Sequence, residues 1–176
     1  ISQKTEGMGL GAGDGSGGEA TAARAAASVD ATEQTAEITD SELERIAKQL
    51  SGKTQVILEK RKIIFYLDDN IYRKGSYNLS QASRANFLDI LSLLKPYGEK
   101  INITIVGHTD NLRVKQREPA QFIRNNFDLS VYRATRALEI AIQNGIEAES
   151  LAAKGAADFQ RNSRSLSLIV TPKGIN

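Results

Sequence analysis

The chain has 176 residues, of which 40% are hydrophobic and 25% are charged, so its size and composition suit one soluble domain with a tail. It contains no cysteine, which excludes a disulfide framework and thiolate metal sites. The net charge of +2 gives no support to nucleic-acid binding, and no apolar run is long enough to cross a membrane as a helix.

Residues 1–38 have low sequence complexity. Seven of the fourteen glycines lie between Gly7 and Gly18, and an Ala-rich run from Ala20 to Ala36 follows them. A Gly-rich chain buries too little apolar surface to offset the entropy lost on ordering. We therefore predict a flexible linker over 1–38, with a disordered tail of no function as the alternative.

An N-terminal helical extension is predicted over residues 39–53. The stretch 39–42, Thr-Asp-Ser-Glu, has the form of a capping box, and Leu43, Ile46 and Leu50 repeat at helical spacing. Gly52 follows the last of these and is expected to end the helix. The folded domain then occupies 54–176.

The first strands of this domain are expected in two apolar runs, 56–58 and 63–67, which are rich in β-branched and aromatic residues. The charged stretch between them has no glycine, so two strands and one long bent strand both remain open. Ser80 is a candidate N-cap for the next helix, which Pro96 and Gly98 are expected to end. Its apolar stripe consists of Phe87, Ile90, Leu91 and Leu94.

A strand with one apolar face is predicted from Ile101, because isoleucines alternate with other residues at 101, 103 and 105. Gly107 ends it. The next helix is expected to run from Leu129, with Asp128 or Ser130 as its N-cap, and to close at 144–145, Asn-Gly. Its inward residues are predicted to be Leu138, Ala141 and Ile142.

The remaining strands are predicted at 151–155 and 164–171, the second of which alternates Leu166, Leu168 and Val170 with other residues. The order strand, helix, strand, helix, strand predicts an α+β fold with the helices on one face of a small sheet. A strand end and a helix start then bring Asp110 and Arg133 to one edge of that sheet. Such a pair makes a site for a zwitterion possible, and a structural salt bridge is the alternative.

Several short motifs in this stretch occur in a family-specific order. The motif Gly107-His108-Thr109-Asp110-Asn111, followed by Asn126-x-x-Leu129-Ser130-x-x-Arg133-Ala134, resembles the OmpA-like peptidoglycan-binding domain. The most similar variant is the C-terminal periplasmic domain of MotB-type flagellar stator proteins, and the resemblance covers roughly 56–171. It implies a βαβαβ two-layer sandwich with a small mixed sheet, and noncatalytic binding of peptidoglycan.

The resemblance also implies roles for individual residues. Arg133 would clamp the carboxylate of diaminopimelate in a peptidoglycan stem peptide, because the planar fork of Arg suits a carboxylate. Asp110 would hold the ammonium of the same ligand. The other matched ligand-binding positions are Thr109, Asn111, Asn126, Asn162 and Arg164. Ser163 departs from the family's Asn-Arg-Arg sequence, and Arg73 stands where the family usually has an acid.

The remaining candidates for chemistry have structural interpretations. His108 is the only histidine and is expected to be a packed, hydrogen-bonded residue, because no partners stand at metal-ligand spacing. Asp68 and Asp69 are expected to form a turn. No nucleophile with an adjacent base is evident, so we predict neither enzymatic activity nor a cofactor. The basic loop 112–127 either attracts the carboxylates of the cell-wall polymer or is a solvated surface loop.

These features predict a periplasmic domain of the cell envelope that anchors a membrane complex, such as a flagellar-stator-like assembly, to peptidoglycan. We expect a homodimer, a tether to the inner membrane, and a membrane-embedded partner reached through a segment N-terminal to the printed sequence. The alternatives are an outer-membrane or lipoprotein wall anchor and a structural component of a secretion assembly. A cell-wall hydrolase is the enzymatic alternative.

Overall fold

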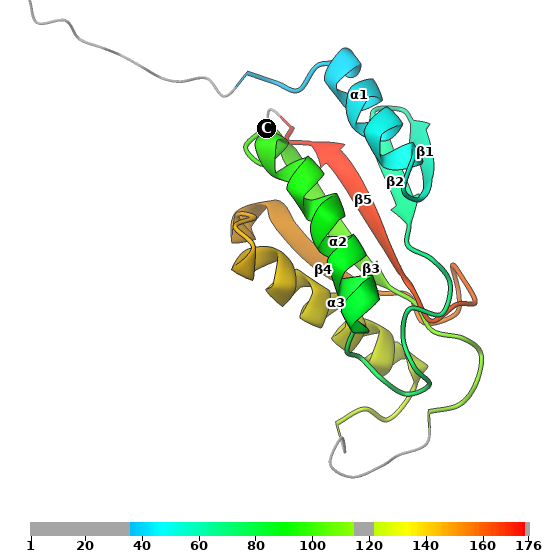
Figure 1. Cartoon of the computed structure of the whole chain (residues 1–176). Helices are drawn as coiled ribbons and strands as arrows, with labels where there is room; N and C mark the ends of the chain where they lie inside the picture. Colours follow the sequence, from blue (N-terminus) through cyan, green and yellow to red (C-terminus); the bar gives the residue numbers. More distant parts are fainter. Residues whose placement is uncertain (1–35, 115–121, 175–176) are drawn as a thin grey trace, which may run out of the picture. The chain divides into compact units, whose positions relative to one another are not determined.

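The computed structural model describes residues 36–114 and 122–174, which form three α-helices and five strands (Figure 1). The helices are α1 (Asp40–Ser51), α2 (Gln81–Leu94) and α3 (Asn126–Gln143), and short 3₁₀ turns occupy Lys95–Tyr97 and Ala148–Ser150. The strands are β1 (Gln55–Glu59), β2 (Lys62–Tyr66), β3 (Ile101–Gly107), β4 (Leu151–Gly155) and β5 (Leu166–Pro172). Residues 1–35 of the predicted linker lie outside the described residues, so the linker stays a prediction.

The five strands form one mixed sheet in the order β1-β2-β5-β3-β4. Strands β3 and β4 are parallel, with Gly107 opposite Gly155, whereas the other neighbouring strands are antiparallel. β3 and β4 are joined through α3, as a parallel pair requires a crossover. The carboxyl ends of β3 and β4 therefore lie at the same end of the sheet.

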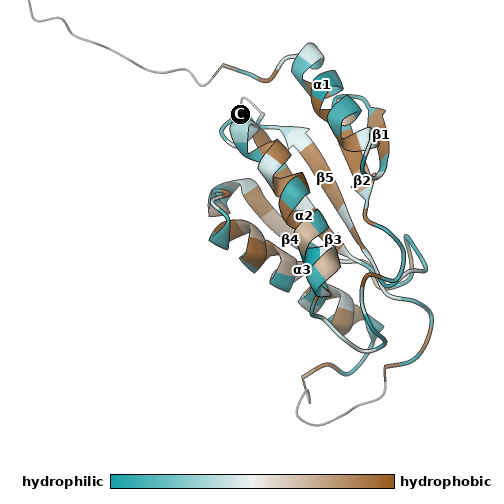
Figure 2. Ribbon diagram, viewed as in Figure 1, coloured by the Kyte–Doolittle hydropathy of each residue, from teal (hydrophilic) through white to brown (hydrophobic). Residues whose placement is uncertain are grey.

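All three helices pack on one face of this sheet, and the side chains between the two layers form one hydrophobic core. Hydrophobic residues run along the strands and alternate with hydrophilic ones around the helices (Figure 2). On the opposite face, Ile64 and Ile169 are only partly buried and Ile57 is exposed. The predicted α+β sandwich with helices on one face is confirmed. The core side chains of β3 and β5 are Ile101, Ile103, Ile105, Leu166, Leu168 and Val170.

Helix α1 begins with the predicted capping box. The Thr39 amide donates to Glu42 Oε2 at 2.8 Å, and the Glu42 amide donates to Thr39 Oγ1 at 3.2 Å. Leu43, Ile46 and Leu50 face the core, as their spacing predicts. Lys100, just before β3, forms an ion pair of 3.0 Å with Glu42 and so connects α1 to the central strand.

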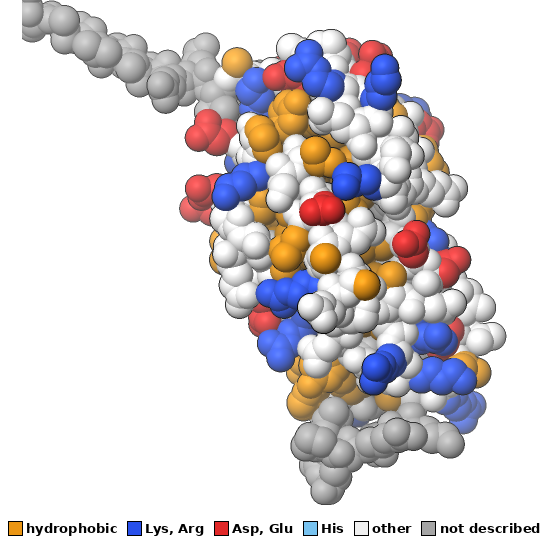
Figure 3. All heavy atoms as spheres, in the orientation of Figure 1, with side chains coloured by type: hydrophobic (Ala, Val, Ile, Leu, Met, Phe, Trp, Pro, Cys, Tyr) orange, Lys and Arg blue, Asp and Glu red, His pale blue; other side chains and the backbone are white. Residues whose placement is uncertain are grey.

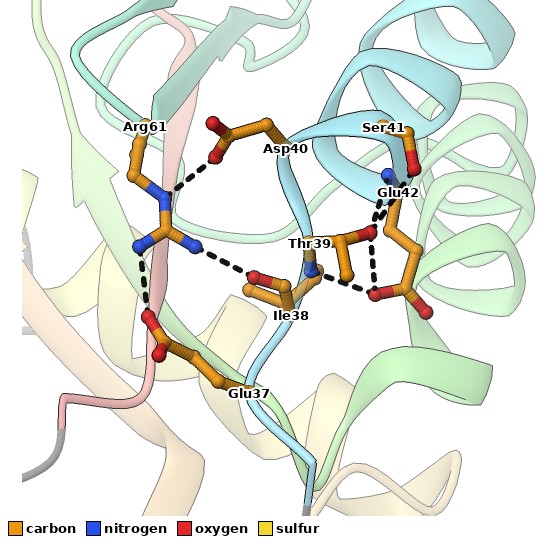
Figure 4. A network of polar contacts seen from close by, with 7 residues as sticks. All are labelled: Glu37, Ile38, Thr39, Asp40, Ser41, Glu42 and Arg61. Carbon is orange, nitrogen blue, oxygen red and sulfur yellow. Dashed lines mark hydrogen bonds and ion pairs between the residues drawn. The ribbon is translucent and has the colours of Figure 1, made fainter.

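Strands β1 and β2 form a tight hairpin whose two-residue turn consists of Lys60 and Arg61. Both residues have positive φ, 48° and 62°, which is unusual for side chains other than Gly, Asn or Asp. The contacts of the Arg61 guanidinium offset the cost of this backbone conformation. The guanidinium pairs with Glu37 and Asp40 at 2.8 Å and donates to the Ile38 carbonyl at 2.6 Å (Figure 4). The turn thus holds the segment that leads into α1.

The loops at the carboxyl ends of β3 and β4 converge at the opposite end of the sheet from the Lys60-Arg61 turn. Backbone hydrogen bonds join the two loops: the His108 amide donates to Ser165 and the Thr109 amide to Ala157. The Tyr72 amide, in the loop after β2, donates to Arg164 at the same end. Lys and Arg side chains lie close to this end on the face that Figure 3 shows. None of the described helices is both long and apolar enough to span a membrane.

Candidate functional site

Two glycines allow the start of α3 to lie directly on the end of the sheet. A Cβ atom at Gly107 would lie 1.9 Å from the Ser130 carbonyl oxygen, and one at Gly155 would lie 2.6 Å from Ser130 Oγ. These distances are too short for any side chain. The pair of glycines at one register position therefore sets how closely the helix approaches, and with it the position of Arg133.

Helix α3 begins earlier than predicted, and its predicted N-cap is wrong. The cap is Asn125, whose Oδ1 accepts a hydrogen bond of 2.8 Å from the Asp128 amide. Asp128 lies in the first turn instead, where its carboxylate accepts from the Arg124 amide at 2.9 Å. Ser130 Oγ is engaged elsewhere: it donates to the Phe127 carbonyl and accepts from the Ala157 amide.

The inward face predicted for α3 is also partly wrong. Ala141 is buried and Leu138 packs against the core, but Ile142 is 42% exposed. The buried stripe runs instead through Ala137 and Ile140, in line with Ser130 and Ala134, which contact the sheet at Gly107.

Arg133 is the largest fully buried side chain among the described residues. Its Nε donates to the Ser76 carbonyl at 2.8 Å and its Nη1 to the His108 carbonyl at 2.7 Å. The guanidinium lies 4.5 Å from the centre of the Tyr72 ring, which is a cation–π contact. Nη2 has no hydrogen-bond partner, and no carboxylate of the described residues forms an ion pair with Arg133.

Burial is the main reason that the pKa of the Arg133 guanidinium falls to about 10, with the charge of Arg164 acting in the same direction. The group still carries its positive charge at neutral pH. A buried cation whose hydrogen-bond partners are all neutral is a costly arrangement, because its lost hydration is only partly replaced. The negative charge of Asp110 acts on Arg133 from nearby and raises its pKa, which offsets part of this cost. Arg133 therefore has unused capacity for an anion.

Asp110 is paired with Arg164 rather than with Arg133. Its Oδ2 accepts a hydrogen bond of 2.7 Å from Arg164 Nη1, and both side chains are about one-fifth exposed. Arg164 Nε donates to the Tyr72 carbonyl at 2.9 Å, so it also ties Asp110 to the loop after β2. Asn126 Nδ2 donates to the Asp110 carbonyl at 3.0 Å and fixes the same turn from α3.

Asp110, Asn126 and Arg133 line one open pocket of about 700 Å³. The pocket lies between the loop after β2, the segment after β3 and the start of α3. Three exposed basic residues belong to its lining, Arg73, Lys74 and Arg113. The other lining residues are Gly75, Ser76, Leu112, Val114, Ile123 and Leu129.

The other predicted site residues support this pocket without lining it. Asn162 Oδ1 accepts a hydrogen bond of 2.9 Å from the Asn111 amide, which joins the loop before β5 to the segment after β3. Thr109 is 1% exposed, and its amide donates to the Ala157 carbonyl. Arg164 does not line the pocket but holds the carboxylate of Asp110, which does. Among the seven predicted residues, three line the pocket and four do not.

Tyr72 contributes to the site through its contact with Arg133, and the sequence analysis did not predict this role. Its ring lies under the Arg133 guanidinium, and burial raises the pKa of its hydroxyl. No motif marks this role, because the two residues are far apart in the chain. The one available signal was an aromatic residue directly before the basic pair Arg73 and Lys74.

His108 is buried, as the sequence predicts for a packed residue, and its Nε2 lies 2.7 Å from Ser167 Oγ. Burial lowers its pKa to about 4, and the charge of Arg161 contributes. Asp69 pairs with Arg161 at 2.9 Å and lies at a turn. Among the described residues, no group of His, Asp and Glu side chains is arranged to hold a metal ion.

Comparison with solved structures identifies several proteins of similar fold. A MotB-like protein from Desulfovibrio vulgaris matches with a TM-score of 0.61 at 17% identity, over 76% of this chain and 91% of that chain. The periplasmic domain of Helicobacter pylori MotB matches with 0.58 at 15%, over 69% and 87%. The cell wall anchor of the T6SS from Pseudomonas aeruginosa matches with 0.57 at 16%, over 74% and 97%.

At these identities the structural similarity shows a common fold. A search among curated proteins found no significant match. The family model described as "OmpA family" matches residues 71–167, which is more than half of the chain and includes the pocket residues Asp110, Asn126 and Arg133. On this match, the chain belongs to the OmpA family.

Proposed function

We propose that this domain binds peptidoglycan without catalysis and anchors a membrane complex to the cell wall. The stem peptide would enter the 700 Å³ pocket, with the free end of diaminopimelate between Arg133 and Asp110. Membership of the OmpA family and a fold shared with the cell wall anchor of the T6SS support this proposal.

The observation that carries the proposal is the unpartnered Nη2 of a buried Arg133 beside an open pocket. Two donors of the guanidinium are used by the Ser76 and His108 carbonyls, so the group is fixed in orientation before any ligand arrives. A ligand carboxylate would supply the missing anion. Such a charge-assisted hydrogen bond contributes about 1.5–3 kcal/mol.

Asp110 suits an ammonium because one of its oxygens is held by Arg164 while the other makes only a long contact, 3.4 Å from the Leu112 amide. Asp110 is the one acidic residue among the described residues that line the pocket, whereas three basic residues lie at its rim, Arg73, Lys74 and Arg113. The pocket therefore favours a ligand with more carboxylates than ammonium groups. A diaminopimelate-type stem peptide has that balance.

Noncatalytic binding is supported by the burial of His108, the only histidine of the sequence. His108 and Ser167 are within hydrogen-bond distance and resemble a base with its nucleophile, yet both are buried and neither lines a described pocket. A nucleophile must reach its substrate, and these two cannot. The proposal therefore gives this pair no part in hydrolysis, and incubation with purified peptidoglycan should release no muropeptides.

The direct test is cosedimentation with insoluble diaminopimelate-type peptidoglycan. Arg133→Ala and Asp110→Ala should each weaken retention by about 10- to 100-fold, as the loss of one charge-assisted hydrogen bond implies. Arg136→Ala is the matched control, since Arg136 is an exposed Arg on the same helix whose partner is Glu139. Because Arg133 is buried, Asp110→Asn should be tested as a variant that keeps the shape of the side chain. Equal retention of Asp110→Asn, Asp110→Ala and the unaltered protein would overturn the assignment.

The wider setting follows from the same proposal. The domain would act in the periplasm, tethered to the inner membrane, and a homodimer would multiply the hold of a weak single site on a polymer. An outer-membrane lipoprotein anchor is the alternative, and the fold match to the T6SS wall anchor favours a secretion assembly as a further one. Sedimentation equilibrium of the purified chain tests the dimer.

A further inference from the structure

Three aromatic side chains form a cluster that joins the loop after β2 to the beginning of α3. The ring centres of Phe122 and Tyr132 are 4.6 Å apart, and that of Tyr77 lies 5.9 Å from Tyr132 and 6.5 Å from Phe122. Tilted rings at these distances have the geometry that aromatic pairs prefer. Tyr77 belongs to the loop after β2, which passes beside the start of α3 (Figure 1).

This aromatic cluster, Tyr77, Phe122 and Tyr132, belongs neither to the core nor to the lining of the pocket. Phe122 is 47% exposed, and the two tyrosines are partly buried. None of the three is among the residues that form the hydrophobic core or pack against it. None of them lines the pocket that contains Arg133. The cluster therefore contributes little to the core and does not meet a ligand in that pocket directly.

Each ring of the aromatic cluster is next in sequence to a residue that lines the pocket. For Tyr77, Phe122 and Tyr132 these neighbours are, in the same order, Ser76, Ile123 and Arg133. The most direct connection is at Tyr77. The carbonyl that accepts the 2.8 Å hydrogen bond from Arg133 Nε belongs to the planar peptide between Ser76 and Tyr77. The position of the Tyr77 ring therefore affects the direction of this carbonyl.

The loop 73–78 has few other attachments of this kind. Its hydrogen bonds with other described residues are local, apart from the one that Arg133 donates. The Ser76 amide donates to the Arg73 carbonyl at 3.0 Å, and the Asn78 amide donates to Ser76 Oγ at 3.2 Å. These bonds shape the turn but do not connect it to α3. The ring of Tyr77, packed on Tyr132, supplies a second connection beside the Arg133 hydrogen bond.

We propose that the aromatic cluster positions the Arg133 guanidinium for the ligand carboxylate. Tyr77 and Phe122 are positioning residues, which act through the Ser76 carbonyl and Arg133 rather than on the ligand. A guanidinium that is held in place before binding loses less freedom when the ligand arrives. The inference rests on the proposed function, because the carboxylate is that of the stem peptide proposed for this pocket.

The test compares two ligands by calorimetry: the diaminopimelate-containing stem peptide and the same peptide with the carboxylate at the free end of diaminopimelate converted to an amide. The unaltered protein should bind the carboxylate form about tenfold more tightly. Tyr77→Ala and Phe122→Ala should each reduce this ratio to about twofold while the affinity for the amide form stays the same. Tyr77→Phe, which keeps the ring, should retain the tenfold ratio.

Ile142→Ala is the matched control, since Ile142 is an exposed apolar residue near the other end of α3 and should change neither affinity. A tenfold ratio that persists in Tyr77→Ala and Phe122→Ala would overturn the inference. Equal weakening of both peptides would also overturn it, because the rings would then touch the ligand or only stabilise the fold. An unaltered protein that binds neither peptide, or binds both alike, would instead refute the proposed function.

A second measurement needs no ligand and therefore tests the positioning of Arg133 by itself. The hydrogen on Arg133 Nε is held by the Ser76 carbonyl, so its exchange with water, followed by NMR, reports on that bond. Tyr77→Ala should speed this exchange about tenfold, and Tyr77→Phe should leave it unchanged. An exchange rate that is the same in Tyr77→Ala and in the unaltered protein would show that the cluster does not position Arg133.

Discussion

At the scale of single residues, Arg133 combines full burial with hydrogen-bond partners that are all neutral. Buried charges in proteins are usually paired, because the loss of hydration is otherwise too large. The face of the Tyr72 ring replaces part of that hydration. The remaining deficit makes the pocket electrostatically incomplete, and an incoming carboxylate would complete it.

His108 supports a prediction about acid stability. Burial lowers its pKa to about 4, whereas an unfolded histidine titrates near 6.5. Between these values the unfolded chain binds a proton that the folded chain does not, so stability is complete above pH 6.5 and falls as the pH approaches 4. The loss from this residue should reach about 3 kcal/mol.

The measurement is the free energy of unfolding in urea at several pH values from 7 to 4. His108→Gln keeps a polar side chain beside Ser167 but cannot be protonated, so its stability should fall less steeply across this range. Carboxylates titrate equally in both proteins, and the difference between the two curves isolates His108. Parallel curves would show that His108 is not buried in the neutral form.

The residues of the pocket were easier to predict from the sequence than the ion pairs that they form. Asp110, Asn126 and Arg133 were all predicted for one site, and they do line one pocket. The ion pair of Asp110 with Arg164 was not predicted, because the two residues are 54 positions apart and nothing local signals which cation will reach the carboxylate. Partner choice depends on the packing of three loops.

At the scale of elements, the contact between α3 and the sheet depends on glycine. Gly107→Ala should destabilise the fold by about 1–3 kcal/mol or more, because the added Cβ would overlap the Ser130 carbonyl at 1.9 Å and force the helix outward. The same displacement would move Arg133, so binding to peptidoglycan should weaken as well. Urea unfolding and cosedimentation measure the two effects.

Gly52→Ala is the matched control for this prediction. Gly52 has a φ of −73°, and the nearest atom to an added Cβ is the Gln49 carbonyl oxygen at 3.9 Å. Alanine fits there without strain and restricts the unfolded chain, so stability should stay equal or rise by up to about 1 kcal/mol. Similar losses for both variants would show that the space at Gly107 is not what matters.

Element boundaries were harder to predict than the elements themselves. The hairpin between β1 and β2 gave no clear signal, because its turn residues Lys60 and Arg61 are not those that tolerate positive φ easily. Contacts of Arg61 with the distant segment 37–40 hold the turn, and no local pattern reveals them. Similarly, three polar residues near the start of α3 could each cap it. Asp128 accepts from the Arg124 amide and Ser130 from the distant Ala157 amide, which leaves Asn125 as the cap.

At the scale of the whole domain, two polar networks lie at opposite ends of the sheet. The Arg61 network, with Glu37 and Asp40, lies at the turn end (Figure 4). The Asp110–Arg164 pair lies at the carboxyl end of β3. The strands between them share one core. The end at which the chain enters α1 is thus separate from the end proposed to hold the cell wall.

This separation predicts that the two networks act independently. Arg61→Ala removes contacts with Glu37, Asp40 and the Ile38 carbonyl, so amide hydrogens of α1 should exchange faster, whereas the affinity for stem peptide should stay within about twofold. Lys62→Ala, which removes a neighbouring exposed cation and leaves the Arg61 contacts intact, should change neither measurement. In Arg61→Ala combined with Asp110→Asn, each effect should keep the size that it has alone. If Arg61→Ala weakened the binding of the peptide strongly, the two ends would be coupled through the sheet, and tension on the N-terminal segment would then act on the pocket itself.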